Sequence, residues 1–327
     1  MKKLLLTFFA LQAALFVGAQ QDVQFSQNRF LSTSINPGAS GIKGMDCFGL
    51  IARQQWIGFE GAPTTAMLTY ESALIEYNSG FGAVLVYDKI GFEQNLFFKG
   101  NYAYHFILPN GAKLGLGVDV GIISKQLSGE FIAGVASDPD LIGLNGQNSL
   151  NFDLGLGAFY YTNTLYFGVS GQKLVPQKIN WGTSEPQIRP HTYFMGGYTY
   201  AATVDLDLKP SFLVKTDFTS TQVDVNLTAE YQKYLWLGAS YRIQDAIVVN
   251  IGMHIKDVAP NPIKVGLAYD FTTSNLREAG QFNFPNSNEI KQSNRSVGSV
   301  ELYLGYCFVK PEKPNFDHYV DPLFLNN

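Results

Sequence analysis

Residues 114–122 read LGLGVDVGI, and their alternation decides the fold. Every second position is apolar: Leu114, Leu116, Val118, Val120 and Ile122. The positions between them hold three glycines and Asp119. Because successive side chains point to opposite faces of a β-strand, this period of two predicts a strand with one apolar face and one small or polar face.

The same pattern recurs along most of the chain. Each stretch has about 10 residues, the length that a tilted strand needs to cross a membrane. The strands of a soluble β-sandwich alternate as well, but they are usually shorter. Fourteen stretches fit the pattern, at residues 46–56, 64–75, 80–89, 94–108, 112–124, 150–161, 165–174, 190–201, 206–218, 222–232, 234–244, 246–256, 262–272 and 295–308.

The composition supports a membrane protein built from strands. The chain has 25 Phe, 18 Tyr and 32 Gly but only 15% charged residues, a combination that is rare in soluble domains. In a transmembrane barrel, alternate residues face lipid while the others face a polar lumen. We therefore predict an all-β fold: a transmembrane, antiparallel, up-and-down β-barrel of fourteen strands over residues 46–308. An even strand number is the rule for bacterial single-chain barrels.

The N-terminus is typical of a secretory signal. Two lysines precede an apolar run from Leu4 to Val17, and small residues follow at Gly18 and Ala19. We expect cleavage after Ala19, which makes residues 1–19 the signal peptide and the mature protein integral to the outer membrane. No later stretch has the about 20 consecutive apolar residues of a spanning helix.

The connections between the predicted strands test the count. The longest are residues 125–149, 175–189 and 273–294, and all three follow odd-numbered strands. They therefore share one rim, whereas tight turns such as 109–111 and 162–164 lie on the other. Long loops outside and short turns in the periplasm is the polarity expected of such barrels.

The two cysteines lie at the ends of the barrel sequence. Cys47 is near the start of the first strand and Cys307 near the end of the last, and both fall on the lumen side of the alternation. Closing the barrel brings them to the same rim. A disulfide across the seam is one expectation, provided that the Cβ atoms come within about 4.5 Å; two free thiols are the other.

The predicted lumen carries charges of both signs. A selective pore more often has one dominant sign at its constriction, so a mixed lumen favours salt bridges and a narrow or blocked interior over an open pore. The inward charged positions are Arg53, Glu71, Asp88, Lys99, Asp119, Asp153, Lys209, Lys215, Asp224, Glu230, Arg242, Lys264, Asp270 and Glu301.

Two segments flank the predicted barrel. Residues 20–45 lack sustained alternation and are either a plug inside the lumen or a periplasmic lead-in. Residues 309–327 contain three prolines, which exclude a spanning strand, so we expect a periplasmic tail. This tail docks on a periplasmic partner, folds back onto the barrel base, or is frayed.

The sequence gives no sign of catalysis. The four histidines, at positions 105, 191, 254 and 318, lack metal-ligand spacing, and no phosphate-binding loop or hydrolase motif is present. Asp138 and Asp140 lack the ligand order of a calcium loop and are read as solvated surface. We expect neither an enzyme nor a cofactor, and the formal net charge of −4 argues against a nucleic-acid partner.

Residues 54–63, QQWIGFEGAP, would form the loop between the first two strands on the outer rim. Trp56 and Phe59 would lie at the level of an aromatic girdle, and the glycines and Pro63 would make the turn. An isolated carboxylate such as Glu60 is expected to cap backbone N–H groups rather than to act in catalysis.

Two stretches resemble one family. Residues 24–27, QFSQ, are followed by INPGASG at 35–41, and QWIGFEGAPTT stands at 55–65. Together they are similar to the signature of the PorP/SprF family of outer-membrane proteins, associated with type IX secretion and gliding motility in Bacteroidota. Gly38, Ser40 and Glu60 depart from the commonest pattern of that family, and the resemblance covers about the first sixth of the chain.

The resemblance implies a role in protein export rather than solute transport. We expect the barrel to bind and anchor, or assist the export of, a secreted surface protein or adhesin through that protein's C-terminal domain. Docking on the periplasmic ring of the secretion and gliding machinery, or a passive pore for hydrophobic solutes, are the alternatives. The expected partners are this exported protein, ring components and outer-membrane lipid. The candidate contact residues are Trp56, Phe59, Glu60, Phe131, Leu141, Leu144, Trp181, Phe282, Phe284, Phe316, Tyr319 and Phe324.

Overall fold

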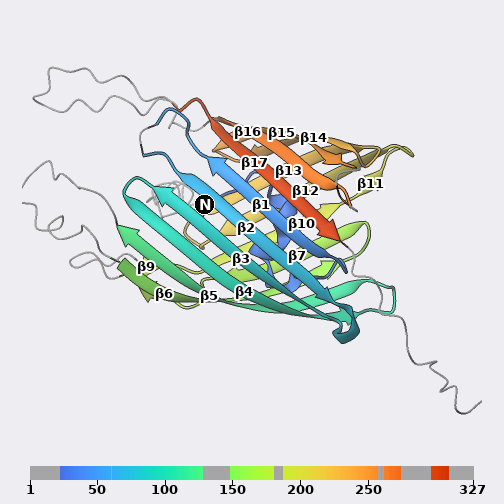
Figure 1. Cartoon of the computed structure of the whole chain (residues 1–327), viewed down its shortest axis with the longest axis horizontal. Helices are drawn as coiled ribbons and strands as arrows, with labels where there is room; N and C mark the ends of the chain where they lie inside the picture. The colour runs from blue at the N-terminus through green and yellow to red at the C-terminus, as the bar shows by residue number, and fades with distance from the viewer. Residues whose placement is uncertain are drawn as a thin grey trace, which may run out of the picture.

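The computed structural model describes residues 23–59, 61–127, 148–179, 187–256, 259, 261–273 and 296–308. It is a closed antiparallel β-barrel of fourteen spanning strands (Figure 1), which confirms the predicted fold class. Among the described residues, no helix is both long and apolar enough to cross a membrane.

The spanning strands follow one another around the barrel in chain order. The eighth is interrupted and is divided between β10 and β11. The strands are β1 (Asp46–Gln54), β2 (Thr64–Leu74), β3 (Ser79–Ile90), β4 (Glu93–Ile107), β5 (Lys113–Leu127), β6 (Asn148–Tyr161), β7 (Leu165–Gln172), β10 (His191–Tyr198) with β11 (Tyr200–Ala201), β12 (Leu206–Thr216), β13 (Thr221–Tyr231), β14 (Leu235–Arg242), β15 (Ala246–Ile255), β16 (Ile263–Thr272) and β17 (Ser299–Phe308).

The alternation sorts side chains between lipid and lumen as the sequence predicts. On β5, Leu116, Val118 and Val120 are 47, 45 and 59% exposed on the outer surface, whereas Asp119 between them is fully buried. A strand in hydrocarbon must present apolar side chains outward, because the bilayer offers no hydrogen-bond partner to a polar group.

The break between β10 and β11 has a local cause. It lies across from the stretch of β12 between Leu208 and Ser211, which contains Pro210. Proline has no backbone N–H to donate to the ladder, so regular pairing stops there.

The connection from β7 to β10, predicted as a long loop over residues 175–189, contains a two-stranded sheet of β8 (Gln177–Lys178) and β9 (Gln187–Ile188). Strands of two residues are too short to show a period of two in the sequence. The alternation that predicted the spanning strands could therefore not predict these two.

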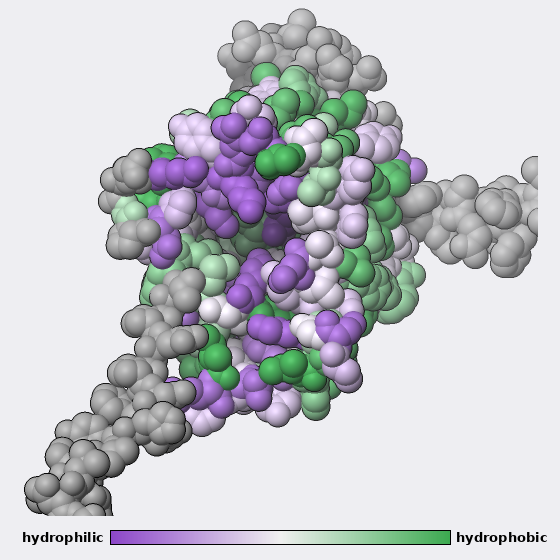
Figure 2. All heavy atoms as spheres, turned by 90° about the vertical axis from the view of Figure 1, so that its right-hand side faces the viewer, coloured by the Kyte–Doolittle hydropathy of each residue, from purple (hydrophilic) through white to green (hydrophobic). Residues whose placement is uncertain are grey.

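The two ends of the barrel differ. We call the end with the connections β1–β2, β5–β6, β7–β10 and β16–β17 the loop rim. The opposite end, with the short connections at 75–78, 108–112, 162–164, 202–205 and 232–234, is the turn rim. Figure 2 faces this turn rim, which is hollowed at its centre and bordered by hydrophilic side chains.

The seam lies between the first and last strands. β1 pairs with β17 from Asp46 opposite Phe308 to Gln54 opposite Val300, so the barrel has no open edge there. Cys47 lies directly opposite Cys307, and the two form a disulfide across a sequence separation of 260 residues. The seam is thus covalently closed near the turn rim.

Breaking this disulfide is expected to lower the stability of the barrel without preventing its closure, because the seam ladder remains. A Cys47→Ser, Cys307→Ser double variant should lose about 2–4 kcal/mol of unfolding free energy, the usual contribution of a disulfide that closes a long loop. The measurement is urea unfolding in detergent, in which the folded and unfolded fractions are read from their different mobilities on a gel. Wild type treated with reductant is the matched control and should behave like the variant; equal stability of oxidised and reduced protein would contradict the prediction.

Candidate functional site: the filled lumen

The lumen is occupied by the chain's own N-terminal part. Residues 23–45, which we call the lumen segment, form three short turns: η1 (Asn28–Phe30), α2 (Ser32–Ile35) and η2 (Pro37–Ala39). Hydrogen bonds join the segment to β16 and β17 on one wall and to β6 and β7 on the opposite wall. The segment therefore spans the interior, as a plug would.

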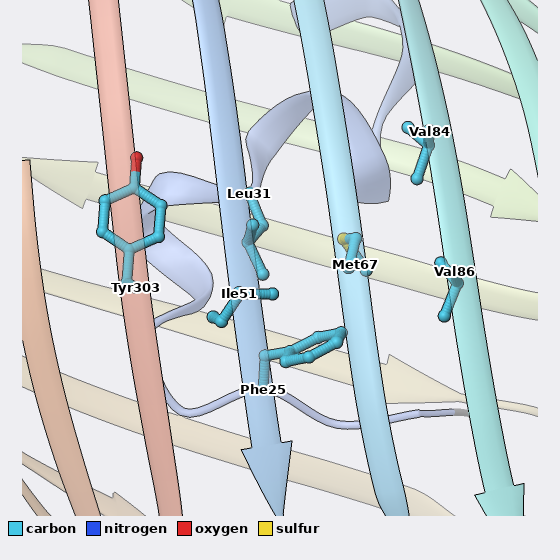
Figure 3. Close-up of a cluster of buried hydrophobic side chains, with 7 residues drawn as sticks. All are labelled: Phe25, Leu31, Ile51, Met67, Val84, Val86 and Tyr303. Carbon is cyan, nitrogen blue, oxygen red and sulfur yellow. The ribbon is translucent and has the colours of Figure 1, made fainter.

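An apolar cluster holds the first part of the lumen segment (Figure 3). Phe25 and Leu31 are buried against Ile51 on β1, Met67 on β2 and Tyr303 on β17. These apolar wall residues stand among the charged and polar side chains of the lumen. Full burial of one such side chain contributes about 1.5–3 kcal/mol, so this cluster stabilises the segment in its place.

Ser26 lies at the centre of a polar network next to this cluster. Its hydroxyl donates to Asp270 at 2.7 Å and accepts from Arg53 at 2.9 Å. The Glu301 carboxylate accepts hydrogen bonds from the backbone N–H groups of Ser26 and Gln27, each at 2.8 Å. Three residues of the QFSQ motif thus have a defined role: Phe25 fills the apolar cluster, Ser26 binds the charged wall, and Gln27 binds it through its backbone N–H.

The charged groups around Ser26 are themselves paired across the strands. Arg53 binds Asp270 at 2.7 Å and Glu301 at 3.2 Å, and Arg242 binds Asp224 at 3.2 Å and Asp270 at 3.3 Å. Each of these five side chains is almost completely buried. Removing one partner of a buried pair typically costs about 3–5 kcal/mol, because the other charge is left uncompensated. The inward charges that the sequence predicted are therefore fixed here, near the loop rim.

Asn36 ties the segment to the opposite wall. Its side-chain amide donates to the carbonyl oxygens of Ala158 on β6 and Val169 on β7, at 2.9 and 3.1 Å. Its side-chain oxygen accepts from the backbone N–H of Gly38 at 2.9 Å, which caps η2. Asn36 is fully buried, so all of these bonds are shielded from water.

Glycines on the wall make room for this contact. A Cβ added at Gly115 or Gly117 on β5 would overlap the backbone of Gly38, and one at Gly157 on β6 would overlap the Asn36 side chain. The inward glycines of the LGLGVDVGI stretch are therefore the floor on which η2 lies. The sequence predicted that these glycines share one face of the strand, but it did not predict that η2 packs against them.

The turn-rim half of the segment is bound as well. Glu71 on β2 accepts from Thr33 Oγ1 at 2.5 Å and from the Gly41 N–H at 3.2 Å. His105 Nε2 lies 3.0 Å from the carbonyl oxygen of Ser40. Asn36, Ser40 and Gly41 of the NPGASG stretch thus each have a hydrogen-bond partner on the barrel wall.

A second element fills the lumen near the loop rim. Ile179 and Ile188, on either side of the β8–β9 hairpin, pack against Ile123 on β5 and Phe97 on β4. Strands β4 and β5 and the connection between β7 and β10 therefore all contribute to this cluster. Together with the lumen segment, it narrows the interior from the loop rim downward.

Of the residues suggested as partner contacts, Trp56 and Phe59 are described. They lie in one loop at the loop rim, where the Phe59 N–H donates to the Trp56 carbonyl at 3.1 Å. Ile57 between them pairs with Val297 and Gly298, so the loop is fixed to the start of β17. Phe59 is partly exposed and Trp56 half-buried.

The other suggested contact residues lie outside the described part of the chain. They are Glu60, Phe131, Leu141, Leu144, Trp181, Phe282, Phe284, Phe316, Tyr319 and Phe324. Within the described ranges, no group of three or more His, Cys, Asp or Glu side chains is arranged to hold a metal ion.

The residues that fill the lumen are largely those that carried the family resemblance. The sequence matches the model of the type IX secretion system membrane protein PorP/SprF over residues 17–290. The chain belongs to the PorP/SprF family. A comparison with curated proteins gives no match.

Solved structures similar to this PorP/SprF protein are outer-membrane barrels. The toluene transporter TbuX of Ralstonia pickettii has 11% identity and a TM-score of 0.48, with 84% of this chain and 92% of the transporter covered. Omp33 of Acinetobacter baumannii has 8% identity and a TM-score of 0.44, with 81 and 99% covered. The KdgM porin has 9% identity and a TM-score of 0.39, with 80 and 99% covered. Likenesses this distant say nothing about what the PorP/SprF protein transports or binds.

A side chain on the glycine floor is expected to displace the lumen segment while leaving the strands paired. Gly117→Val should loosen residues 23–45, because the new side chain overlaps Pro37 and Gly38. Limited proteolysis of the folded barrel in detergent, followed by mass spectrometry, should reveal cleavage within 23–45. Gly100→Ala on β4 is the control, since a Cβ there meets nothing. Equal protection of the segment in Gly117→Val and wild type would show that the floor does not hold it.

Proposed function

We propose that this PorP/SprF protein is a closed membrane partner of the type IX secretion machinery. In this proposal it binds and anchors, or assists the export of, a secreted surface protein through that protein's C-terminal domain. Family membership supports the link to type IX secretion. The loop rim faces the cell exterior and the turn rim the periplasm, in keeping with the usual polarity of long and short connections.

The observation that carries the proposal is the filled lumen. A pore needs a continuous polar path, and a hydrophobic-solute channel needs an apolar one. Here the lumen segment is bonded to opposite walls through Ser26 and Asn36, and the Ile179–Ile188 cluster narrows the space above it. A barrel filled by its own chain is better suited to present surfaces to another protein than to conduct solutes.

The proposed contact surface is the loop rim. Phe59 is an exposed aromatic side chain on a loop that is fixed at both ends, and rigid aromatic residues commonly anchor protein interfaces. Trp56 belongs to the same loop. The remaining candidate residues on the connections 128–147, 180–186 and 274–295 would extend this surface.

The first test asks whether the barrel conducts. Purified protein in a planar bilayer should give no discrete ion conductance, because the lumen segment blocks the path. Deletion of residues 23–42 is the positive control and should open a channel. Steady conductance of the intact protein would overturn the proposal and leave a passive pore.

The second test asks whether the protein holds an exported partner. Mild-detergent purification from the native outer membrane, through a tag after Asn327, should recover a large exported protein in stoichiometric amount. Phe59→Ala should reduce that recovery severalfold, because it removes an exposed anchor. Phe218→Ala is the matched control and should leave the recovery unchanged. Phe218 is also exposed on a loop-rim turn, but this turn is the connection between β12 and β13, away from the Phe59 loop.

Each outcome of the second test has one meaning. Recovery of the barrel alone would contradict the proposal. Recovery of periplasmic ring proteins instead, lost on deletion of residues 309–327, would favour docking on the ring machinery.

A further inference from the structure

The turn rim holds a hollow that the lumen segment leaves open (Figure 2). The α2 and η2 turns pack toward β2 and β4–β7. The opposite wall, formed by β12–β16, carries polar side chains into the space that remains. We call this space the turn-rim vestibule.

Basic side chains gather on the vestibule wall around one carboxylate. Glu230 on β13 accepts a hydrogen bond from Lys209 on β12, and His254 Nε2 on β15 lies 3.5 Å from its other oxygen. Lys264 on β16 is directly across from His254 in the strand register. The second carboxylate on this wall, Asp207, stands opposite Glu230.

Two cations in the vestibule, Lys264 and Arg29, form no ion pair with a described carboxylate. Lys264 makes no hydrogen bond or ion pair with any described residue, and its charged neighbours are Lys43, Glu230, Arg29 and Lys209. Arg29 in η1 also makes none; its guanidinium lies over the rings of Phe30 and Trp236, at 4.3 and 5.3 Å. Among the described groups, Glu230, which already accepts a hydrogen bond from Lys209, is therefore the carboxylate that Lys264 and Arg29 share.

Other buried donors nearby also lack acceptors among the described residues. No described residue accepts a hydrogen bond from the indole N–H of Trp236, the Nε–H of Arg29 or the side-chain NH₂ of Asn28. The side-chain nitrogen and oxygen of Gln27 also have no hydrogen-bond partner among the described residues. Trp236 is only 1% exposed. Burial lowers the pKa of Arg29 to about 10, and the Glu230 carboxylate only partly opposes that shift. Trapped water can accept these hydrogen bonds, but it cannot neutralise the excess positive charge.

The aromatic side chains define what kind of anion fits. Phe30 stacks on Tyr303 at 4.3 Å between ring centroids and packs against Trp236 at 5.5 Å. The Arg29 guanidinium lies next to the Phe30 and Trp236 rings. A ligand that joins carboxylates to apolar side chains matches both features, whereas a free inorganic anion uses only the charges.

We propose that the turn-rim vestibule is a binding site for an acidic peptide segment, whose carboxylates pair with Lys264 and Arg29 and whose apolar side chains pack on the partly exposed Phe30 ring. The peptide enters from the turn rim. The proposed function is needed only to identify its source as a protein of the export pathway on the periplasmic side; the site itself is defined by residues within the barrel.

The test is calorimetric titration of the purified full-length protein in detergent. The probe is a blocked hexapeptide of alternating glutamate and phenylalanine, with the glutamine–phenylalanine peptide and inorganic phosphate as comparisons. The acidic peptide should bind saturably, and more weakly as salt rises. Lys264→Gln should weaken binding by at least about tenfold, as expected when one partner of a largely desolvated charge pair is lost.

Two further variants make the result decisive. Lys264→Arg keeps the charge and should restore binding, which separates loss of charge from loss of fold. Lys233→Gln removes the same charge from an exposed position on the turn between β13 and β14 and should bind like wild type. Equal affinity of wild type and Lys264→Gln, or of the acidic and neutral peptides, would overturn the proposal.

Binding of phosphate as tight as that of the peptide would reduce the vestibule to a site for small anions and would also overturn it. None of these titrations depends on recovery of an exported partner from the membrane. Failure of the vestibule site and failure of the proposed function are therefore distinguishable.

Discussion

Backbone hydrogen bonding in a bilayer is the constraint on which this structure depends. Hydrocarbon offers no partner to an unpaired N–H or C=O, so a sheet that crosses the membrane must close on itself. The β1–β17 and β10–β12 pairings provide that closure. Closure with fourteen strands in turn creates an interior too wide for the inward side chains of the strands alone to fill.

The N-terminal part of the chain fills this interior, and the chemistry of the lumen follows from it. Ser26 requires the carboxylates of Asp270 and Glu301, and these require Arg53 and Arg242 to balance them. On the other wall, Asn36 requires glycines where it approaches β5 and β6. The mixed signs of the inward charges and the abundance of inward glycine are thus two consequences of one event, the insertion of residues 23–45.

The filling is uneven, and this gives the two ends of the barrel different properties. Near the loop rim, Arg53 and Arg242 form buried pairs with their carboxylates, and the Ile179–Ile188 cluster packs between the walls. Near the turn rim, Lys264 and Arg29 form no ion pair with a described residue and have Glu230 as their shared carboxylate neighbour, and the nearby Trp236 indole N–H has no acceptor among the described residues. Burying a cation without a counter-charge is costly unless something else supplies it, so among the described residues the turn-rim cations are the groups best placed to bind an added anion.

The period of two in the sequence determined the strands, their lipid-facing side and the even count, because a bilayer demands apolar side chains on one face of every strand. It located Leu116, Val118 and Val120 outside and Asp119 inside without any knowledge of the partners of Asp119. The same pattern could not show what fills the lumen. Residues 23–45 have no periodicity, and their contacts are made with residues up to 275 positions away.

Only the tertiary structure decided that Ser26 meets Asp270 and Glu301, that Gly115 and Gly117 support η2, and that Arg29 lies over Trp236 with Lys264 as a charged neighbour. The physical reason is that strand periodicity is a local property, set by each residue and its solvent. The occupant of a lumen and the pairing of its charges depend instead on which distant segments closure of the barrel brings together.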